Sequence, residues 1–553
     1  MGTARNAQFQ KATGGRGGSS ARLPLVLVLV ACQVGTSSDN AALSMATSSL
    51  ASSLGASVAD IQLASIVYSL AAGACMVAGG MVGVMVGWRR SLRFGLALVV
   101  AGELALAASP TMAVFTWAGR LTVGLGASLV TPSVLGLVPA LWEGRDRVFA
   151  FGCISGGIAV SSFASIPLGM VLDAFGFRAA FFALGAYFLA VLAFTSALPA
   201  VGPTRRGLRF DVAGFVLTAT GLSLFLLGVS RMSSWGVVAA SSQAPFSVAG
   251  LSPSLPTVAA GIAVLAVCVR VEDRVDRERG FALLPRSFVR NPTVLSGLLA
   301  VMMPYFYMGA VMIVVTPYLQ MVVGFSAVQC SLANLLLGVP MLLFAMFFPK
   351  AFPSASPRAT VRAGYAFASA SAALMAMGCG ARDVGACFFA GLALAGAGLG
   401  MVNAQANNIV ASAVDARDAR QSGGVQGTAR NIGTALGSAV LGTVLLVTVN
   451  VALPSALGAQ GGVSPSVAAA MGERELSFAG DDAMREELAA LPVEVDAGEG
   501  EAVLEENARV RLGAVRLSLG ILAALSALAL AGARAVPGRG GERGATRCGR
   551  FGS

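Results

Sequence analysis

The sequence contains no histidine and little charge. None of its 553 residues is histidine, and Asp, Glu, Lys and Arg together make up only 12%, about half the share of a typical soluble domain. The eight cysteines are scattered singly, without a CxxC pair, and the chain has no HExxH, GxSxG or P-loop motif. These absences exclude a histidine proton relay or metal site, and they argue against an enzyme.

Apolar residues are abundant instead and fall in long blocks. They make up 56% of the chain, and the mean hydropathy is +0.76. A transmembrane helix needs about 20 mainly apolar residues, and continuous runs favour helices over the alternating strands of a β-barrel. The predicted spans are residues 23–46, 61–86, 92–109, 112–138, 148–172, 178–200, 211–230, 255–271, 294–317, 327–348, 360–380, 384–411, 426–450 and 512–533.

Basic residues predict the orientation of these spans. Most of the 38 lysines and arginines lie in alternate loops and at the chain ends, and Arg430, early in a predicted span, is counted with them. The short turns on the other side hold only Arg178, Arg231 and Arg382. The positive-inside rule therefore predicts an even number of spans with both termini cytoplasmic.

The net charge of +11 is dispersed, so we expect no nucleic-acid surface. With 36 arginines against two lysines, the sequence indicates a GC-rich genome, and we expect a multi-pass protein of a bacterial cell membrane.

Four short stretches resemble one family of transporters. They are residues 210–214 (FDVAG), 282–291 (ALLPRSFVRN), 318–320 (YLQ) and 429–433 (ARNIG). With fourteen predicted spans and both ends inside, residues 20–535 resemble the fourteen-span drug:proton antiporters of the major facilitator superfamily. The resemblance implies a monomeric secondary transporter in the lipid bilayer that moves a small organic substrate by alternating access. It implies no cofactor, because a proton gradient drives the transport.

The same resemblance implies the domain organisation. Two six-helix bundles are expected at residues 23–200 and 294–533, separated by two extra central helices and a cytoplasmic linker at 201–293. Cytoplasmic tails are expected at 1–22 and 534–553. The expected fold class is an all-α membrane protein with the major facilitator fold, built from 14 transmembrane helices.

One predicted external segment is unusually long. Residues 451–511 contain twelve acids and four arginines. We expect a solvated, partly disordered acidic loop with short helical stretches. A vestibule that collects cations is the alternative.

The loop between the second and third predicted spans resembles motif A of the superfamily. Gly80 and Gly87 would let helices approach closely, and Arg89 and Arg90 would pair with helix ends or acids across a cytoplasmic gate. Positive-inside anchoring of these arginines is the alternative. Val84 stands where the family usually has aspartate, so a charge relay through that aspartate cannot operate here.

The fourth and fifth predicted spans carry helix-packing features. Arg120 and Gly124 belong to a stretch that resembles motif B, in which small residues allow close packing beside the arginine. The glycine-proline order of motif C, the antiporter signature, is lost in the fifth span, although Pro167 still predicts a bend. This departure weakens the case for antiport and leaves the expected fold unchanged.

Three charged residues within the predicted spans are the candidates for proton coupling: Asp39, Glu103 and Arg120. Charge inside a bilayer is costly, so each should have a partner and face the bundle interior or water. A carboxyl group desolvated in a bundle can bind and release a proton, and the arginine would tune the acids or hold a counter-charge. The alternatives are acids solvated near the outer interface and an arginine in a structural ion pair or at an interface.

The C-terminal bundle contains no acid that we place inside the membrane. Its predicted substrate-binding residues are Tyr305, Tyr307, Asn403 and Asn407, and the two asparagines share one helix face. Tyrosines and amides among methionines suit a cavity for amphipathic organic molecules. Hydrogen bonds between helices are the alternative for the amides.

The sequence therefore predicts proton-coupled export of drugs or other small organic compounds. Uptake or facilitated diffusion of a metabolite is the alternative that the altered motifs A and C favour. A non-transporting membrane sensor is a third interpretation, but no appended soluble domain supports it.

Overall fold

The computed structural model describes residues 18–536 with gaps. The gaps are 57, 143, 200–210, 242–243, 248–249, 280–287, 289–290, 353, 414–421, 460–462, 473–477, 479 and 494. Most of both predicted tails and most of the 282–291 stretch therefore lie outside the described residues, whereas residues 211–214 are described. Within that part, the chain is helical, with two isolated β-bridges and no longer strand.

The first helices form an N-terminal bundle around one apolar core. Its elements are α2 (Gly18–Met45), α3 (Thr47–Leu54), α4 (Val58–Val86), α5 (Trp88–Ala107), α6 (Met112–Val114), the π-helical turn η1 (Phe115–Arg120), α7 (Leu121–Leu141), α8 (Gly144–Phe194) and η2 (Thr195–Ala197). The long α8 covers two predicted spans, which are divided at Gly176, where φ is +76°. Glycine adopts this left-handed backbone without a steric cost.

Two central helices and a C-terminal bundle follow. The elements are α9 (Val212–Ser230), α10 (Met232–Trp235), α11 (Ser254–Arg279), α13 (Pro292–Pro317), η3 (Tyr318–Val322), α14 (Ala327–Ala351), α15 (Pro357–Gly378), α16 (Ala386–Ala413), α17 (Ser422–Ala459), α18 (Pro465–Gly472), α19 (Asp481–Ala489), α20 (Ala497–Gly532) and η4 (Ala533–Ala535). Local caps set several starts. Asp211 accepts a hydrogen bond from the Gly214 amide at 3.0 Å, and Ser326 forms a capping box that opens α14.

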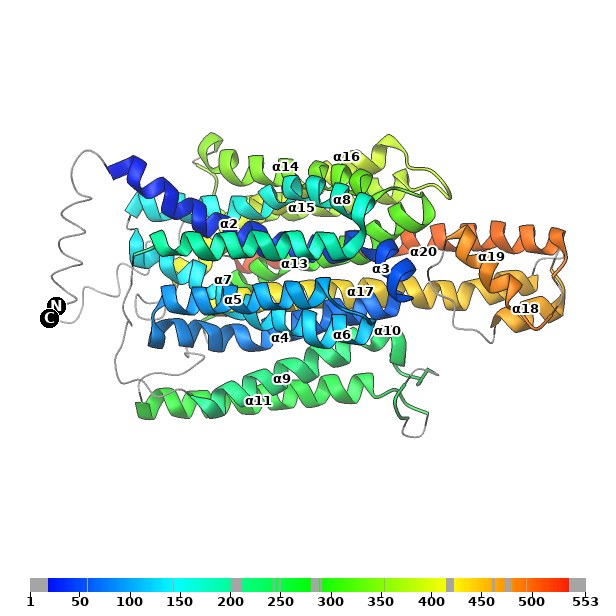
Figure 1. The fold of residues 1–553 in the computed structure, drawn as a ribbon, viewed down its shortest axis with the longest axis horizontal. Coiled ribbons are helices and arrows are strands. Elements are labelled where there is room, and N and C mark those ends of the chain that lie inside the picture. The colour runs from blue at the N-terminus through cyan, green and yellow to red at the C-terminus, as the bar shows by residue number, and fades with distance from the viewer. Residues whose placement is uncertain are drawn as a thin grey trace.

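The central helices α9 and α11 pack on each other and lie along one side of the molecule, beside α4 and α17 (Figure 1). A Cβ atom added to Gly221 would lie 2.8 Å from Leu265 Cγ, so glycine permits this close helix contact. The N-terminal and C-terminal bundles have separate apolar cores. They meet along two seams, α4 against α17 and α8 against α14.

Eleven helices in the described part of the chain are long and apolar enough to cross a membrane. The all-helical membrane fold is therefore confirmed, whereas the predicted fourteen spans are not separately resolved. One of the eleven, Phe163–Ala197, covers parts of two predicted spans. Two other predicted spans correspond to α5 and α15, which are not among the eleven. The reason lies in their composition, since α5 has three arginines in its first six residues, and α15 has two arginines and many alanines.

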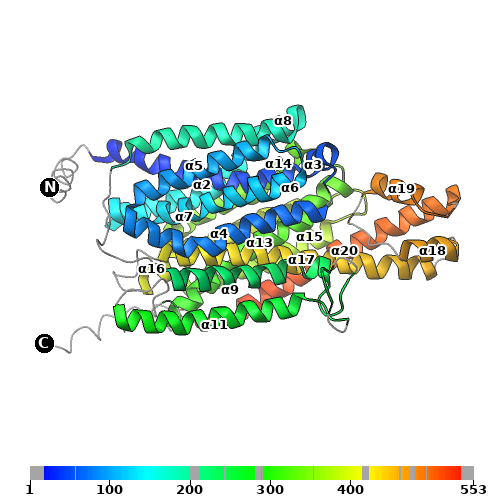
Figure 2. The same cartoon turned by 60° about the horizontal axis from the view of Figure 1, so that its bottom comes forward.

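The prediction of a solvated, partly disordered loop at 451–511 was wrong for the residues described. α17 and α20 both continue beyond the bundle, and α18 and α19 pack against them (Figure 2). Apolar residues bury one face of these helices as part of the C-terminal core. Glu506 is buried as well, whereas Asp482, Glu486, Asp496, Glu501 and Glu505 are exposed. The buried residues include Val467, Met471, Phe478, Met484, Leu488 and Val503. We call α18, α19 and the adjoining ends of α17 and α20 the helical extension.

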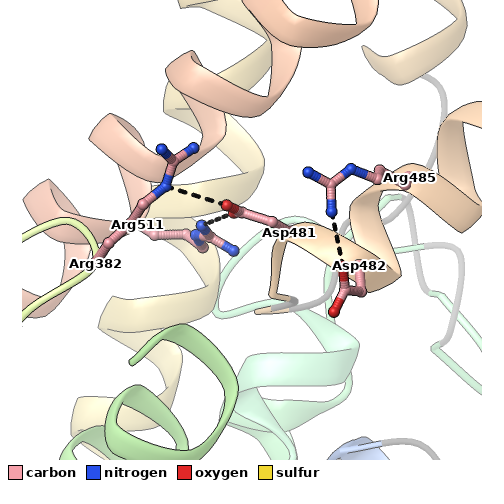
Figure 3. Close-up of polar contacts among 5 residues, drawn as sticks. All are labelled: Arg382, Asp481, Asp482, Arg485 and Arg511. Carbon is pink, nitrogen blue, oxygen red and sulfur yellow. Dashed lines mark hydrogen bonds and ion pairs between the residues drawn. The ribbon is translucent and has the colours of Figure 1, made fainter. Parts of the chain in front are cut away.

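An ion-pair network fastens this extension to the C-terminal bundle (Figure 3). Arg511 Nη2 donates to Asp481 Oδ1, and Arg382, in the turn between α15 and α16, lies 3.3 Å from Asp481 Oδ2. The Arg511 side chain is only 2% exposed. The pair of Asp482 with Arg485 lies beside it on the surface of α19. The network makes Asp481 the polar link between the extension and the bundle.

Candidate functional site

The three charged residues predicted for proton coupling lie together in the core of the N-terminal bundle. Arg120, at the end of η1, donates from Nη1 to Asp39 Oδ1 of α2 at 2.6 Å, and both side chains are essentially unexposed. Glu103 of α5 is also fully buried and lies close enough to interact with both. Neither Glu103 oxygen is in hydrogen-bond geometry with a described residue. Arg120 thus pairs directly with Asp39, and Glu103 is a second carboxyl group beside this pair.

Glycines on neighbouring helices bring these side chains together. A Cβ atom at Gly124 of α7 would lie 2.7 Å from the Tyr68 carbonyl oxygen of α4, and one at Gly102 of α5 would lie 2.6 Å from a Val123 methyl carbon. The absence of side chains at these points lets α4, α5 and α7 approach closely. The three helices therefore enclose the Arg120 guanidinium.

Tyr68 forms the wall between this charged cluster and a large cavity. The Arg120 guanidinium lies over the Tyr68 ring, 4.6 Å from its centroid, in a cation–π arrangement. Tyr68 and Asn40 both line the cavity, whereas Asp39, Glu103 and Arg120 are not among its lining residues. One aromatic side chain therefore contacts the charged cluster and also lines the cavity.

The cavity lies between the two bundles and has an empty volume of about 1520 Å³, including the part open to solvent. Its N-terminal side is mostly hydroxyls and amides from α2 and α4, and its C-terminal side adds methionines and tyrosine. The lining residues include Gln33, Asn40, Tyr68, Tyr305, Met308, Met312, Asn334, Arg430 and Asn431. A second, more apolar cavity of about 860 Å³ shares Ser44, Met312 and Thr434 with it. This mixed polar and apolar lining suits an amphipathic organic molecule.

The four predicted substrate-binding residues have different surroundings. Tyr305 lines the cavity. Tyr307 does not, because its hydroxyl is buried in the C-terminal core at 2.6 Å from Ser371 Oγ. Asn403 is buried in α16 and is not among the lining residues described. The backbone of Asn407 lies in α16, but its side chain lies outside the described residues.

Tyr68 and Arg430 are among the lining residues that sequence reasoning missed. We grouped Arg430 with the cytoplasmic arginines, but it lies within α17, lines the cavity and is 9% exposed. A signal was present, since a lone arginine inside a predicted span is the pattern that singled out Arg120. Tyr68 carries no comparable signal, because a tyrosine in an apolar helix is ordinary.

The motif A residues lie at the end of the bundle opposite the helical extension. A Cβ atom placed on Gly80 would lie 3.8 Å from Gly424 Cα, at the α4–α17 seam. Gly87 begins α5 with φ at +101°. Arg89 donates to the Ser196 carbonyl oxygen at 3.0 Å, and Arg90 is exposed. This hydrogen bond from Arg89 therefore joins the first turn of α5 to η2.

Pro167 lies in the middle of α8, near the contact with the C-terminal bundle. Two residues later, a Cβ atom at Gly169 would lie 2.9 Å from Ser331 Oγ of α14. Ser331 donates to the Ser165 carbonyl oxygen at 3.0 Å, and Asp173 accepts from the Ala327 amide at 3.3 Å. Small residues around Pro167 thus form the α8–α14 seam.

The fold and site together define a polytopic helical membrane transporter with a central cavity between two bundles. The family model of the Major Facilitator Superfamily matches residues 27–438. The chain belongs to the major facilitator superfamily, which confirms the resemblance seen in the sequence and places it among transporters rather than enzymes.

Similar proteins include two from bacteria of the genus Streptomyces. The chain is 26% identical over 454 residues to a probable actinorhodin transporter of Streptomyces coelicolor, covering 80% of this chain and 74% of that protein. It is 26% identical over 424 residues to the tetracenomycin C resistance and export protein of Streptomyces glaucescens, covering 75% and 74%. A crystal structure of a peptide transporter, POT, with sulfate shares the fold at 15% identity, with a TM-score of 0.56 and coverage of 92% and 96%.

Proposed function

We propose that this transporter exports small organic compounds in exchange for protons. The observation that carries the proposal is the buried cluster of Asp39, Glu103 and Arg120, with Tyr68 between it and the central cavity. With all three groups ionised the cluster carries one net negative charge, and with one bound proton it is neutral. A buried net charge is costly, so the cluster favours proton uptake when it is closed and release when it becomes hydrated.

Tyr68 would link that proton to the substrate. A molecule in the cavity contacts Tyr68 directly, and a shift of the ring changes the surroundings of the Arg120 guanidinium on its other side. Substrate and proton would then compete, because each favours a different position of the Tyr68 ring. Exchange of substrate for proton requires such competition. In this scheme Asp39 and Glu103 carry the proton, and Arg120 supplies the counter-charge.

The alternating motion would use the two seams. Rocking one bundle against the other opens the α4–α17 seam near Gly80 and Gly424, or the α8–α14 seam near Gly169 and Ser331. We assign fourteen spans in a six-two-six order, with both termini cytoplasmic, the helical extension outside and a monomer in the cell membrane. Because Val84 replaces the usual aspartate, the gate near Arg89 would rely on helix packing and backbone hydrogen bonds.

The names of the similar proteins support export over uptake. A probable actinorhodin transporter and a tetracenomycin C resistance and export protein both align with three quarters or more of this chain. We infer that the substrates are antibiotics or similar small organic compounds.

Everted membrane vesicles test the proposal. Acidifying the vesicle interior should drive accumulation of actinorhodin or tetracenomycin C, and a protonophore should abolish it. Asp39→Asn should reduce gradient-driven accumulation at least roughly tenfold, since the proton site is lost. Glu278→Gln, which removes an exposed carboxylate on α11, should transport normally. Accumulation that persists in the protonophore would favour facilitated diffusion, and normal transport by Asp39→Asn would contradict the assignment.

A further inference from the structure

The lining of the central cavity carries charge of one sign. Arg430 is the only charged residue among the lining residues that the structure describes, and no aspartate or glutamate lines the cavity with it. The sequence supports this independently of the structure. Between residues 281 and 472 the only acids are Asp383, Asp415 and Asp418, and all three lie between predicted spans.

Arg430 is held in place against an aromatic ring of the same bundle. Its guanidinium lies 5.2 Å from the centroid of Tyr305, across from α17 to α13. The Tyr305 hydroxyl is buried and has no hydrogen-bond partner among the described residues. A buried hydroxyl without a hydrogen-bond partner is costly. A polar group of a bound ligand would supply the hydrogen bond that the Tyr305 hydroxyl lacks. Both side chains line the cavity.

The two sides of the cavity differ in the acids that accompany their arginines. On the N-terminal side, Arg120 lies over Tyr68 and is neutralised by Asp39, with Glu103 beside it. On the C-terminal side, Arg430 lies over Tyr305, and the predicted spans of that bundle contain no aspartate or glutamate. The N-terminal side therefore holds its arginine with two acids outside the cavity lining, whereas on the C-terminal side Arg430 itself lines the cavity.

We propose that the cavity selects aromatic organic anions, compounds with a carboxylate or an ionised acidic hydroxyl, over organic cations. This inference rests on the proposed transport function and names the substrate class of the same site. Arg430 would bind the anionic group through charge-assisted hydrogen bonds, and Tyr305 would donate a further one. Methionines such as Met308 and Met312 would contact the rings. A cationic amine would meet the positive charge of Arg430 and would be repelled.

Binding to the full-length protein in nanodiscs tests the inference, with three fluorescent probes that share one ring system. The probes are anthracene-9-carboxylate, its neutral amide and 9-anthracenylmethylammonium. We expect the wild type to bind the carboxylate roughly tenfold more tightly than the ammonium, the factor that corresponds to about 1.4 kcal/mol. Arg430→Gln should lower carboxylate affinity to that of the amide and leave the amide unchanged.

Two further variants keep the test interpretable. Arg362→Gln removes an exposed arginine of α15 and should keep the wild-type preference. Arg430→Lys retains the charge and should keep part of the preference, so it carries the test if Arg430→Gln fails to fold. Equal or tighter binding of the ammonium, an unchanged preference in Arg430→Gln, or no binding of any probe would overturn the inference. Because binding needs no gradient, a failure of proton-coupled export would leave the anion preference measurable.

Discussion

Arg120 has charged and aromatic neighbours on several sides in the core of the N-terminal bundle. Its guanidinium has a carboxylate at 2.6 Å, a tyrosine ring at 4.6 Å and a second carboxyl group nearby, and the three charged side chains are without solvent exposure. A buried ion pair adds little net stability, but an unpaired buried charge is costly. Since Glu103 lies beside the Asp39–Arg120 pair, either carboxylate can balance the guanidinium when the other is neutral, so that the two acids share its charge.

This sharing predicts non-additive stability. Asp39→Asn and Glu103→Gln should each be tolerated, because the other carboxylate compensates Arg120. The double variant should lose about 3–5 kcal/mol of unfolding free energy, as expected for an uncompensated buried charge. Adding Arg120→Gln to the double variant should restore part of that loss. Thermal unfolding in detergent measures all four, and a double variant as stable as the wild type would contradict the arrangement.

At the scale of helices, glycine positions decide where neighbours approach. Gly124 lies against the Tyr68 carbonyl oxygen of α4, whereas a Cβ atom added to Gly520 of α20 would meet no other atom within 4 Å. The first contact sets the distance between α4 and α7, and so positions Tyr68 against Arg120. The second glycine has no packing role among the described residues.

The same substitution at these two glycines should have opposite effects. Gly124→Ala places a methyl group 2.7 Å from a backbone oxygen and should cost about 1–3 kcal/mol, with impaired transport. Gly520→Ala should be neutral or stabilising by up to about 1 kcal/mol, because alanine favours helix. Melting temperatures of the two variants provide the comparison. Equal melting temperatures would show that the α4–α7 contact is looser than described.

The attachment of the helical extension to the C-terminal bundle depends on the carboxylate of Asp481. Asp481→Asn removes the carboxylate that faces both Arg511 and Arg382 and should loosen the extension, at a cost of about 1.5–3 kcal/mol for a charged hydrogen bond. Asp482→Asn, whose carboxylate is 97% exposed, should change stability by less than about 0.5 kcal/mol. Limited trypsin cleavage within 451–511 reports the difference. Identical cleavage rates in both variants would contradict the role assigned to Asp481.

At the scale of the whole molecule, some features follow from the sequence and others do not. Long apolar runs must form helices in lipid, so helix positions and order were predictable. Asp39, Glu103 and Arg120 stood out because charge is rare inside spans. The extension did not stand out, because its acids outnumber its basic residues and mask the apolar face that α18 and α19 bury. The contribution of Tyr68 depends on packing between distant segments.

The position of Arg430 shows a second limit. Its place near the start of a predicted span resembles that of a cytoplasmic anchor, and only the path of α17 brings it to the cavity. Acids are therefore distributed unequally across the molecule, since two accompany Arg120 and the predicted spans around Arg430 contain none. Under the proposed mechanism, this asymmetry would separate a proton-binding side from a substrate-binding side.

The most direct measurement of the central claim is proton release by the purified protein when substrate binds. In weakly buffered solution with a pH-sensitive dye, the wild type should release up to one proton per bound molecule as substrate displaces the proton from the Asp39–Glu103–Arg120 cluster. Glu278→Gln should do the same, and Asp39→Asn should bind substrate with little release. Substrate binding without proton release by the wild type, or undiminished release by Asp39→Asn, would contradict the account.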